Sequence, residues 1–389
     1  MNPIIQLMLA ISVVGSNSLA LSPIASTVAT SFASVSATDV MLASALFGLG
    51  TAAGALVLAP SADRLGLKTA LRYSLLLLLT GFVLSATAPA LWVLCLGQSI
   101  AGIASGVALP CTYGLAAEIA PEGKENETLG KVLLGWTLSM VVGVSVASYL
   151  AETVHWRAVY GLWVIATAIV LFGLSSSRTN PGEPNESDQT LNESQSPWTA
   201  LTQPKVVAGL LPVAAFMMAF YGVYGFLGTH LTVNLGASTT TGGFAALVYG
   251  AGFGAVSPID KWMDKFGPIH SGVWVFSLLV LIYLSIGISS SSIQTVLWLC
   301  FVWGALNHLA LNLLVAKLSA INPQRRAAIM GLYSATTYVS MFLGTLLFKS
   351  VFDSLGFSTL GFLAALFILP VAAVSLQAMR HNKKEAPSE

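Results

Sequence analysis

Long stretches without a charged side chain are the feature that most constrains the fold of this sequence. Only 8% of its 389 residues are Asp, Glu, Lys or Arg, whereas about a quarter of a typical soluble domain is charged. A helix that crosses a bilayer needs about 20 residues with little charge. The stretches of this length that lack all four residue types are 1–38, 40–62, 73–117, 132–151, 158–177, 206–259, 266–316, 327–348 and 354–379. The chain is therefore predicted to lie in a membrane.

Three of these stretches are long enough for two helices each, and each has helix-breaking residues near its middle. The breaks are Ala88–Pro89, the Asn-Leu-Gly sequence at 234–236 and the serine cluster at 289–292. Six single and three double stretches predict twelve transmembrane helices. A membrane β-barrel would need strands of about ten residues in which polar and apolar residues alternate. Runs such as 75–79 do not alternate, so the predicted fold class is an all-α membrane protein.

The distribution of Lys and Arg predicts the orientation, because positively charged loops stay in the cytoplasm. If the N-terminus is cytoplasmic, 15 of the 17 basic residues lie on the cytoplasmic side, and only Arg157 and Lys349 lie outside. We therefore expect both chain ends to be cytoplasmic. Residues 1–38 contain no charge, so the basic leader region of a secretory signal peptide is missing. Residues 4–27 are expected to form a retained first helix.

The sequence divides into two halves around a polar segment rich in Ser, Asn, Pro and Glu, a composition typical of a loosely ordered linker. We expect an N-terminal six-helix bundle at 1–174, a cytoplasmic linker at 175–204, a C-terminal six-helix bundle at 205–380 and a cytoplasmic tail at 381–389. Two similar bundles related by a pseudo-two-fold axis are the architecture of an alternating-access carrier.

A short motif recurs in the two halves. Residues 62–66 read Ala-Asp-Arg-Leu-Gly, and residues 263–267, which lie 201 positions later, read Met-Asp-Lys-Phe-Gly. The segment Ala59–Lys68 resembles the loop 2–3 signature of the major facilitator superfamily, whose core is Asp-Arg-x-Gly-Arg-Lys. Ala59 stands in place of the leading glycine of that signature, and Leu67 in place of its second arginine.

The resemblance implies a cytoplasmic gate that clamps the two halves together while the carrier is open to the outside. The alternative is an ordinary charged loop that anchors the end of a helix at the membrane surface. The gate residues implied by the resemblance are Asp63, Arg64, Gly66 and Lys68 in the first copy, and Asp264, Lys265 and Gly267 in the second.

Two further segments are similar to the twelve-helix efflux group of this superfamily, which contains drug/proton antiporters and arabinose-efflux-type permeases. Ser139, Gly143 and Ala147 recur every four residues, a spacing that predicts a helix-packing face. The sequence His155–Arg157 stands where the group has Gly-Trp-Arg. Gln98 occupies the position of an arginine that is associated in the group with proton coupling. Ordinary helix packing explains the small residues equally well.

Polar and aromatic residues inside the predicted helices are the candidates for a solute site, because a polar side chain in lipid is costly unless it has a function. No Asp or Glu lies near the middle of any predicted helix, which favours a neutral, zwitterionic or anionic solute, or a broad aromatic pocket. For the tyrosines and tryptophans the alternative is plain packing. The cavity candidates are Asn17, Gln98, Tyr113, Trp136, Tyr221, Tyr224, Trp303, Asn307 and Asn312.

His308 is the candidate for proton coupling. It is the one titratable side chain that the helix prediction places near mid-membrane, four residues before Asn312 and on the same helix face. Histidine exchanges a proton at physiological pH more readily than any other side chain. The alternative is a neutral, structural histidine that is hydrogen-bonded to a neighbouring asparagine.

These observations predict a secondary active transporter of a small solute that works by alternating access. The resemblance favours an exporter and is compatible with proton-coupled antiport, but it leaves open whether a proton is coupled. Uptake of a neutral or anionic metabolite is the alternative, and a sensor built on a transport fold is a more remote one. Neither an enzyme motif nor a phosphate-binding loop occurs in the sequence, so we expect no enzyme activity, cofactor or metal. The net charge of +1 argues against nucleic acid. A monomer in a bacterial inner membrane is expected.

Overall fold

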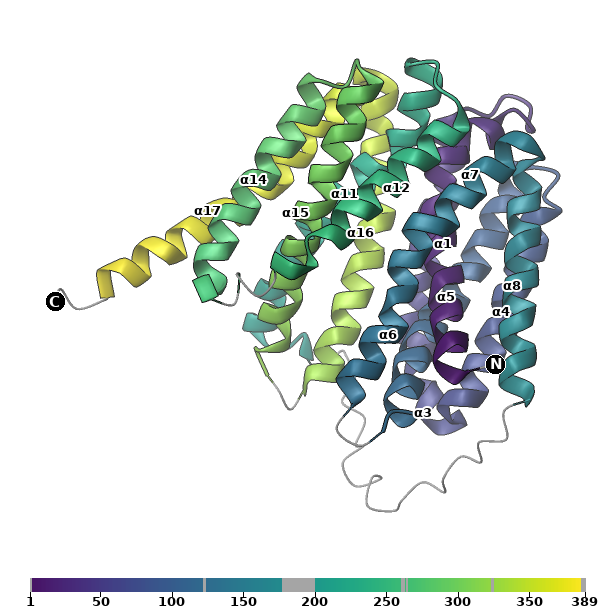
Figure 1. Cartoon of the computed structure of the whole chain (residues 1–389), viewed down its shortest axis with the longest axis horizontal. Helices are drawn as coiled ribbons and strands as arrows, with labels where there is room; N and C mark the ends of the chain where they lie inside the picture. Colours follow the sequence, from purple (N-terminus) through teal and green to yellow (C-terminus); the bar gives the residue numbers. More distant parts are fainter. Residues whose placement is uncertain are drawn as a thin grey trace.

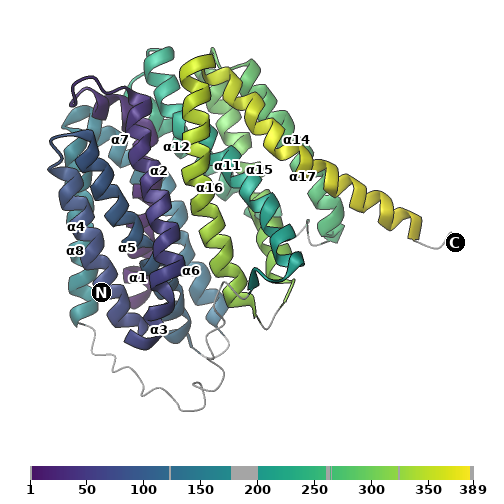
Figure 2. The same cartoon turned by 180° about the vertical axis from the view of Figure 1, so that it is seen from behind.

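The computed structural model describes residues 2–121, 124–176, 200–259, 263, 265–322 and 325–385. The chain is helical throughout this part and contains twelve long helical segments in two groups of six, which Figures 1 and 2 show side by side. The first group consists of α1 (Pro3–Ala29), α2 (Ala37–Ala53) with η1 (Gly54–Leu58), α4 (Leu67–Ala86), α5 (Leu91–Glu118), α6 (Glu125–Leu138) with η3 (Ser139–Gly143) and α7 (Val144–Thr153), and α8 (Trp156–Ser176).

The second group begins at Pro204 and repeats this pattern. Its segments are α11 (Pro204–Thr229) with η4 (His230–Asn234), α12 (Thr239–Ala255), α14 (Pro268–Ile288), α15 (Ile293–Ser319), α16 (Arg326–Leu355) and α17 (Phe357–Glu385). Short turns at η2 (Ala59–Ser61), α3 (Ala62–Leu65) and η5 (Ser257–Ile259) lie between the long helices. In both views α17 extends well beyond its neighbours (Figures 1 and 2).

Eleven of the segments are at least 18 residues long and apolar enough to cross a membrane. The remaining one, α12, has 17 residues and is roughly 26 Å long, slightly less than the hydrocarbon core of a bilayer. The three predicted breaks are confirmed, because α4 ends at Ala86 and α5 begins at Leu91, η4 ends at Asn234, and α14 ends at Ile288. The predicted all-α membrane fold with twelve helices is therefore confirmed.

The repeated loop motif has the same backbone conformation in both halves. Gly66 and Gly267 precede α4 and α14, with φ angles of +79° and +77°. Because only glycine adopts a positive φ without strain, the two glycines provide the same sharp turn at equivalent places. A Cβ on either residue would contact nothing within 4 Å, so the backbone conformation, and not crowding, requires glycine here.

Helix packing is also repeated at the level of single atoms. A Cβ added to Gly102 of α5 would collide with the carbonyl oxygen of Phe47 on α2. A Cβ added to Gly304 of α15 would collide with that of Tyr249 on α12. Gly304 lies 202 positions after Gly102 in the sequence, and Tyr249 lies 202 positions after Phe47. Glycine thus lets α2 contact α5, and α12 contact α15, backbone to backbone.

The small residues of the fifth segment face α1. A Cβ on Gly143 would collide with the hydroxyl of Ser16, and one on Gly15 would lie 2.5 Å from that of Ser139. Ala147 is also fully buried. The helix changes to a π-helical turn at Ser139–Gly143, where the close approach to α1 occurs.

The loops between paired helices define two ends of the molecule. Gly66 and Gly267 lie at one end, here called the Gly66 end. The turn before Asp39 and the last turns of α16, which contain Lys349, lie at the other, here called the Lys349 end. Arg157 also lies at the Lys349 end, where its Nη2 donates to the carbonyl oxygen of Ala88 at 2.7 Å and its guanidinium covers the ring of Trp156.

Candidate transport site

A small cavity lies where the two groups of helices meet. Its volume is about 10 Å³, which is room for about one water molecule. Four helices contribute to its wall, α1 and α2 from the first group and α11 and α16 from the second. The lining residues are Ser18, Leu19, Ser22, Met41, Ser44, Tyr221, Tyr224, Gly225 and Thr345. Hydroxyl groups, aromatic rings and apolar side chains make up this wall, and none of these residues carries a charge.

Polar contacts between the two groups surround the cavity on the side of the Lys349 end. The Ser22 hydroxyl donates to the carbonyl oxygen of Tyr224 at 2.5 Å. Closer to the end of the molecule, the hydroxyls of Thr27 and Thr239 lie 2.8 Å apart. Gly228 approaches the backbone of Ser22 so closely that a Cβ would collide with it. These contacts close the interface between the cavity and the Lys349 end.

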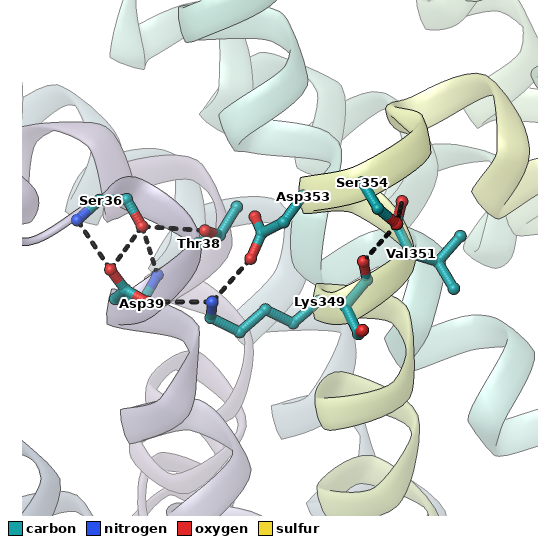
Figure 3. Close-up of polar contacts among 8 residues, drawn as sticks. Ser36, Thr38, Asp39, Lys349, Val351, Asp353 and Ser354 are labelled. Carbon is teal, nitrogen blue, oxygen red and sulfur yellow. Dashed lines mark hydrogen bonds and ion pairs between the residues drawn. The ribbon is translucent and has the colours of Figure 1, made fainter.

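The outer part of this closure consists of charged residues, shown in Figure 3. The ammonium of Lys349 on α16 lies 2.9 Å from Asp39 Oδ1 on α2 and 2.7 Å from Asp353 Oδ2, one turn further along α16. Asp39 also accepts hydrogen bonds from the backbone N–H and hydroxyl of Ser36, at 3.0 and 2.6 Å. We call Asp39, Lys349 and Asp353 the ion-pair latch.

A second charged contact closes the other side of the same interface. Glu152, near the end of α7, accepts a hydrogen bond from the backbone N–H of Thr240 at 2.5 Å. Thr240 lies in the first turn of α12, where a carboxylate interacts favourably with the exposed N–H groups and the helix dipole. Glu152 thus caps a helix of the opposite half.

Of the predicted cavity residues, Tyr221 and Tyr224 line the cavity between the halves. Tyr113 and Trp136 lie together within the first group, where the indole Nε1 donates to the tyrosine hydroxyl at 3.0 Å. Both side chains are partly buried.

Asn17 and Gln98 lie inside the first group, away from that cavity. The Asn17 amide nitrogen donates to Gln98 Oε1 at 2.9 Å, and Gln98 Nε2 donates to the hydroxyl of Ser85 at 3.1 Å. All three side chains are buried. The network joins α1, α4 and α5, and both hydrogen-bond partners of Gln98 are neutral. An arginine at this position would therefore be buried without a counter-charge among these partners.

Trp303 and Asn307 lie inside the second group. Trp303 is fully buried, with its ring centroid 5.0 Å from that of Tyr249 and 5.7 Å from that of Phe220. Asn307 is 1% exposed, and its amide nitrogen donates to the Tyr249 hydroxyl at 2.8 Å. Tyr249 of α12 is therefore the centre of this cluster.

His308 and Asn312 lie on one face of α15, towards its Gly66 end. The His308 Nε2 and the Asn312 amide nitrogen are 3.0 Å apart, and the edge of the imidazole meets the ring of Phe253, with centroids 4.7 Å apart. His308 is partly buried and Asn312 is exposed. The pair is the most accessible polar group among the residues predicted on α15.

The predicted gate at the Gly66 end is described only in part. Lys68 is half-buried, Lys265 is exposed, and Gly66 and Gly267 make the turns described above. Asp264 and the side chains of Asp63 and Arg64 lie outside the described residues. The gate at this end therefore stays a prediction.

Several site residues were not predicted from the sequence. Tyr249 was missed because none of the predicted cavity residues came from its segment, α12. The latch was missed because Asp39 and Lys349 are 310 residues apart. The exceptional position of Lys349 outside the basic cytoplasmic loops was a signal that could have drawn attention to it.

Two six-helix groups that meet around an uncharged cavity define a secondary transporter of solutes across a membrane. Residues 7–345 match the family model of the Major Facilitator Superfamily, and the chain belongs to that family. The predicted superfamily membership is thereby confirmed. The protein is accordingly a multi-pass membrane transporter of a small solute and not an enzyme.

Curated relatives cover most of the chain at low identity. An uncharacterized MFS-type transporter, YwfA of Bacillus subtilis, is 25% identical over 90% of this chain and 85% of its own length. A probable sugar efflux transporter of Pasteurella multocida is 23% identical over 80% of this chain and 75% of its own. The quinolone resistance protein NorA of Staphylococcus aureus is 24% identical over 75% of each chain.

Solved transporter structures share the fold. A crystal structure of the peptide transporter POT superposes with a TM-score of 0.73 at 13% identity, over 96% of this chain and 94% of that one. A D-xylose–proton symporter superposes with a TM-score of 0.71 at 17% identity, over 94% and 96%. At these identities the similarity establishes the fold alone.

Proposed function

We propose that the protein exports a small solute without net charge by alternating access between its two six-helix groups. The observation that carries this proposal is the uncharged cavity between the halves, together with the closure on its Lys349 side. A carrier of this type exposes a central site to one side of the membrane at a time. The contacts of Ser22, Thr27 and the ion-pair latch are those that must break for the site to open towards the Lys349 end.

The chemistry of the cavity supports a neutral or zwitterionic solute. A cation leaving water for a low-dielectric site needs a carboxylate to offset the lost hydration, and the lining residues provide none. Hydroxyls of Ser18, Ser44 and Thr345 and the rings of Tyr221 and Tyr224 can instead hydrogen-bond and cover a hydroxylated or amphipathic solute.

The orientation completes the proposal. With the Gly66 end in the cytoplasm, the basic loops lie inside, as the positive-inside rule requires, and both chain ends are cytoplasmic. The Lys349 end then faces outward in a bacterial inner membrane, and the closed interface lies between the cavity and the outside, so an exporter in this state would load from the cytoplasm once its Gly66 side opens. Efflux proteins among the curated relatives agree with this direction. A single chain contains both halves, so a monomer is sufficient.

Coupling to a proton is part of the proposal, with His308 as the exchanging group. It is a half-buried imidazole beside the exposed Asn312 on α15, on the part of that helix that lies towards the Gly66 end. Gln98 replaces the arginine of the efflux group and lies in a neutral, buried network, so we do not assign coupling to that position.

The test is transport in a bacterial host that lacks its own exporters. Cells are loaded with a panel of labelled neutral sugars, zwitterionic amino acids and the lipophilic cation ethidium, and efflux is followed with and without an uncoupler. We expect expression to accelerate loss of at least one net-neutral solute, and the uncoupler to abolish the acceleration. Ethidium efflux without efflux of any neutral solute would refute the proposal that the solute has no net charge. Net accumulation of a neutral solute on expression would show that the protein imports it.

A matched pair of variants connects this activity to the cavity. Ser22→Leu places a large apolar side chain into a position that is 3% exposed and should abolish transport. Thr80→Leu makes the same type of change at an exposed position on α4 and should leave transport intact. Equal transport activity in the two variants would show that the cavity is not part of the solute pathway.

A further inference from the structure

We propose that Lys349 releases Asp39 but keeps Asp353 when the Lys349 end opens, and that Asp353 sets how readily this happens. The inference rests on the proposed alternating-access function and assigns a regulatory role to Asp353, on the surface of the protein. In the closed interface Lys349 contacts two carboxylates, Asp39 across the interface and Asp353 on its own helix (Figure 3). Opening separates α2 from α16, so Lys349 loses Asp39 and retains Asp353.

Each charge of the broken pair has a partner within its own half. Lys349 and Asp353 are four residues apart on α16, a spacing that keeps them in contact whatever α2 does. Asp39 is part of a capping box, in which its carboxylate accepts from Ser36 while its own N–H donates to the Ser36 hydroxyl. Neither charge is therefore left without a partner when the halves separate, and breaking a charged contact costs most when a partner is left unpaired.

The two carboxylates also act on each other. In the closed interface they share one ammonium, so two negative charges face one positive charge, and like charges held this close repel. Opening moves Asp39 away and relieves the repulsion. Asp353 thus weakens the closed state, whereas Asp39 stabilises it.

This arrangement predicts opposite effects from two similar substitutions. Asp39→Asn removes the contact across the interface, so the Lys349 end should open more often. Asp353→Asn removes the repulsion and leaves Asp39 as the remaining carboxylate of the latch, so the same end should open less often. Because the side chains of Lys349, Asp39 and Asp353 are 19%, 34% and 42% exposed, we expect changes of about two- to fivefold in each direction, the range of partly exposed ion pairs.

Cysteine accessibility measures the opening without any solute. Cys95, Cys111 and Cys300 are replaced by alanine in the full-length protein, and Ser44→Cys provides a thiol in the closed cavity, at a position that is 5% exposed. A membrane-impermeant maleimide is applied to intact cells, and in parallel to inside-out vesicles. From the Lys349 side, the labelling rate should rise with Asp39→Asn and fall with Asp353→Asn. Changes of the same sign, or no change in either variant, overturn the proposal.

Two further variants keep the result interpretable. Lys349→Gln leaves two carboxylates facing each other and should raise the labelling rate at least as much as Asp39→Asn. Glu127→Gln removes the acid from another lysine pair with the same four-residue spacing, Glu127 and Lys131 at 2.6 Å, which lies within one helix and away from the latch. It should leave labelling unchanged. A fall in labelling with Lys349→Gln overturns the proposal.

The labelling result is independent of the transport result. If no solute of the panel is exported but the two aspartate variants still change labelling in opposite directions, the proposed roles of Asp39 and Asp353 stand and the assignment of the solute fails. If export is observed and the labelling rates do not diverge, the proposed function stands and the role of Asp353 is refuted.

Discussion

Gly102 and Gly304 make the same backbone contact in the two halves of the protein. Each is the residue at which a Cβ would collide with a carbonyl oxygen of the neighbouring helix, that of Phe47 for Gly102 and that of Tyr249 for Gly304. The two contacts are 202 residues apart in sequence. An internal repeat recognised from a loop motif thus extends to the packing inside each half.

The first prediction follows from this contact. Gly102→Ala and Gly304→Ala should each destabilise the protein by about 1–3 kcal/mol, because the helices must move apart to admit a methyl group. Gly161→Ala is the control, since a Cβ there contacts nothing within 4 Å and alanine is the better helix former. Thermal denaturation in detergent, followed by size-exclusion chromatography, measures the difference. Similar thermal midpoints for all three variants would contradict the equivalent role of the Gly102 and Gly304 contacts in the two halves.

The buried amide network gives a second prediction. Gln98→Leu should cost about 1–3 kcal/mol, because it leaves the buried Asn17 amide without its acceptor. The double substitution Asn17→Leu with Gln98→Leu removes both groups and should cost less than the sum of the single changes. Thermal midpoints of the four proteins complete this double-mutant cycle. Strict additivity would show that the hydrogen bond between Asn17 and Gln98 contributes nothing.

Tyr249 allows a third prediction. Tyr249→Phe removes the acceptor of the Asn307 amide inside the aromatic cluster, so a buried donor loses its hydrogen bond at a cost of about 1–3 kcal/mol. Tyr73→Phe is the matched control, because Tyr73 is 62% exposed. The expected result is a lower thermal midpoint for the first variant and an unchanged one for the second.

A fourth prediction concerns the cap that Glu152 provides to α12. Glu152→Ala should destabilise the closed interface by about 1 kcal/mol, the typical loss for a helix cap. Labelling of the Ser44→Cys reporter from the Lys349 side should then rise roughly fivefold, as 1.4 kcal/mol corresponds to tenfold. Glu127→Ala serves as the control on the same helical segment. An unchanged rate in Glu152→Ala would mean that Thr240 finds an equivalent acceptor.

His308 is the subject of the fifth prediction. His308→Gln keeps a polar side chain beside Asn312 but cannot exchange a proton, so solute export should lose its sensitivity to an uncoupler and fall to the rate of passive exchange. Asn312→Ala removes the neighbour and keeps the imidazole, so export should remain sensitive to the uncoupler. If both variants remain coupled, His308 is structural.

The helices and their breaks could be predicted from the sequence because each depends on local chemistry. Absence of charge identifies a membrane segment, and helices end beside the Ala-Pro pair at 88–89 and the serine cluster at 289–292. The shortest of the twelve segments, α12 with 17 residues, lies in the second half of the uncharged stretch 206–259, where a helix was predicted. The small residues at Ser139 and Gly143 indicated a packing face, but not that α1 would occupy it.

The candidate site was less accessible to sequence reasoning, because it is made by contacts between distant segments. Asn17 and Gln98 are polar residues inside helices, yet they hydrogen-bond to each other within one half and are not part of the cavity wall. The hydroxyls of Ser18 and Ser44 are common side chains whose role depends on which helix faces them. Lys349 was visible as an exception to the charge distribution, and its partner Asp39 could only be found in three dimensions.

The contrast between the two kinds of interface has a mechanical consequence. Within each half, glycines bring backbone against backbone, and such a contact has no adjustable side chain that could let one helix slide past the other. Between the halves, apart from the close approach of Gly228 to the backbone of Ser22, the polar contacts described above involve hydroxyls and carboxylates, which water can replace one by one as the surfaces separate. Each half is thus stiff, whereas the interface between the halves is easily changed. The halves can therefore separate by the width of a solute with little deformation inside either of them.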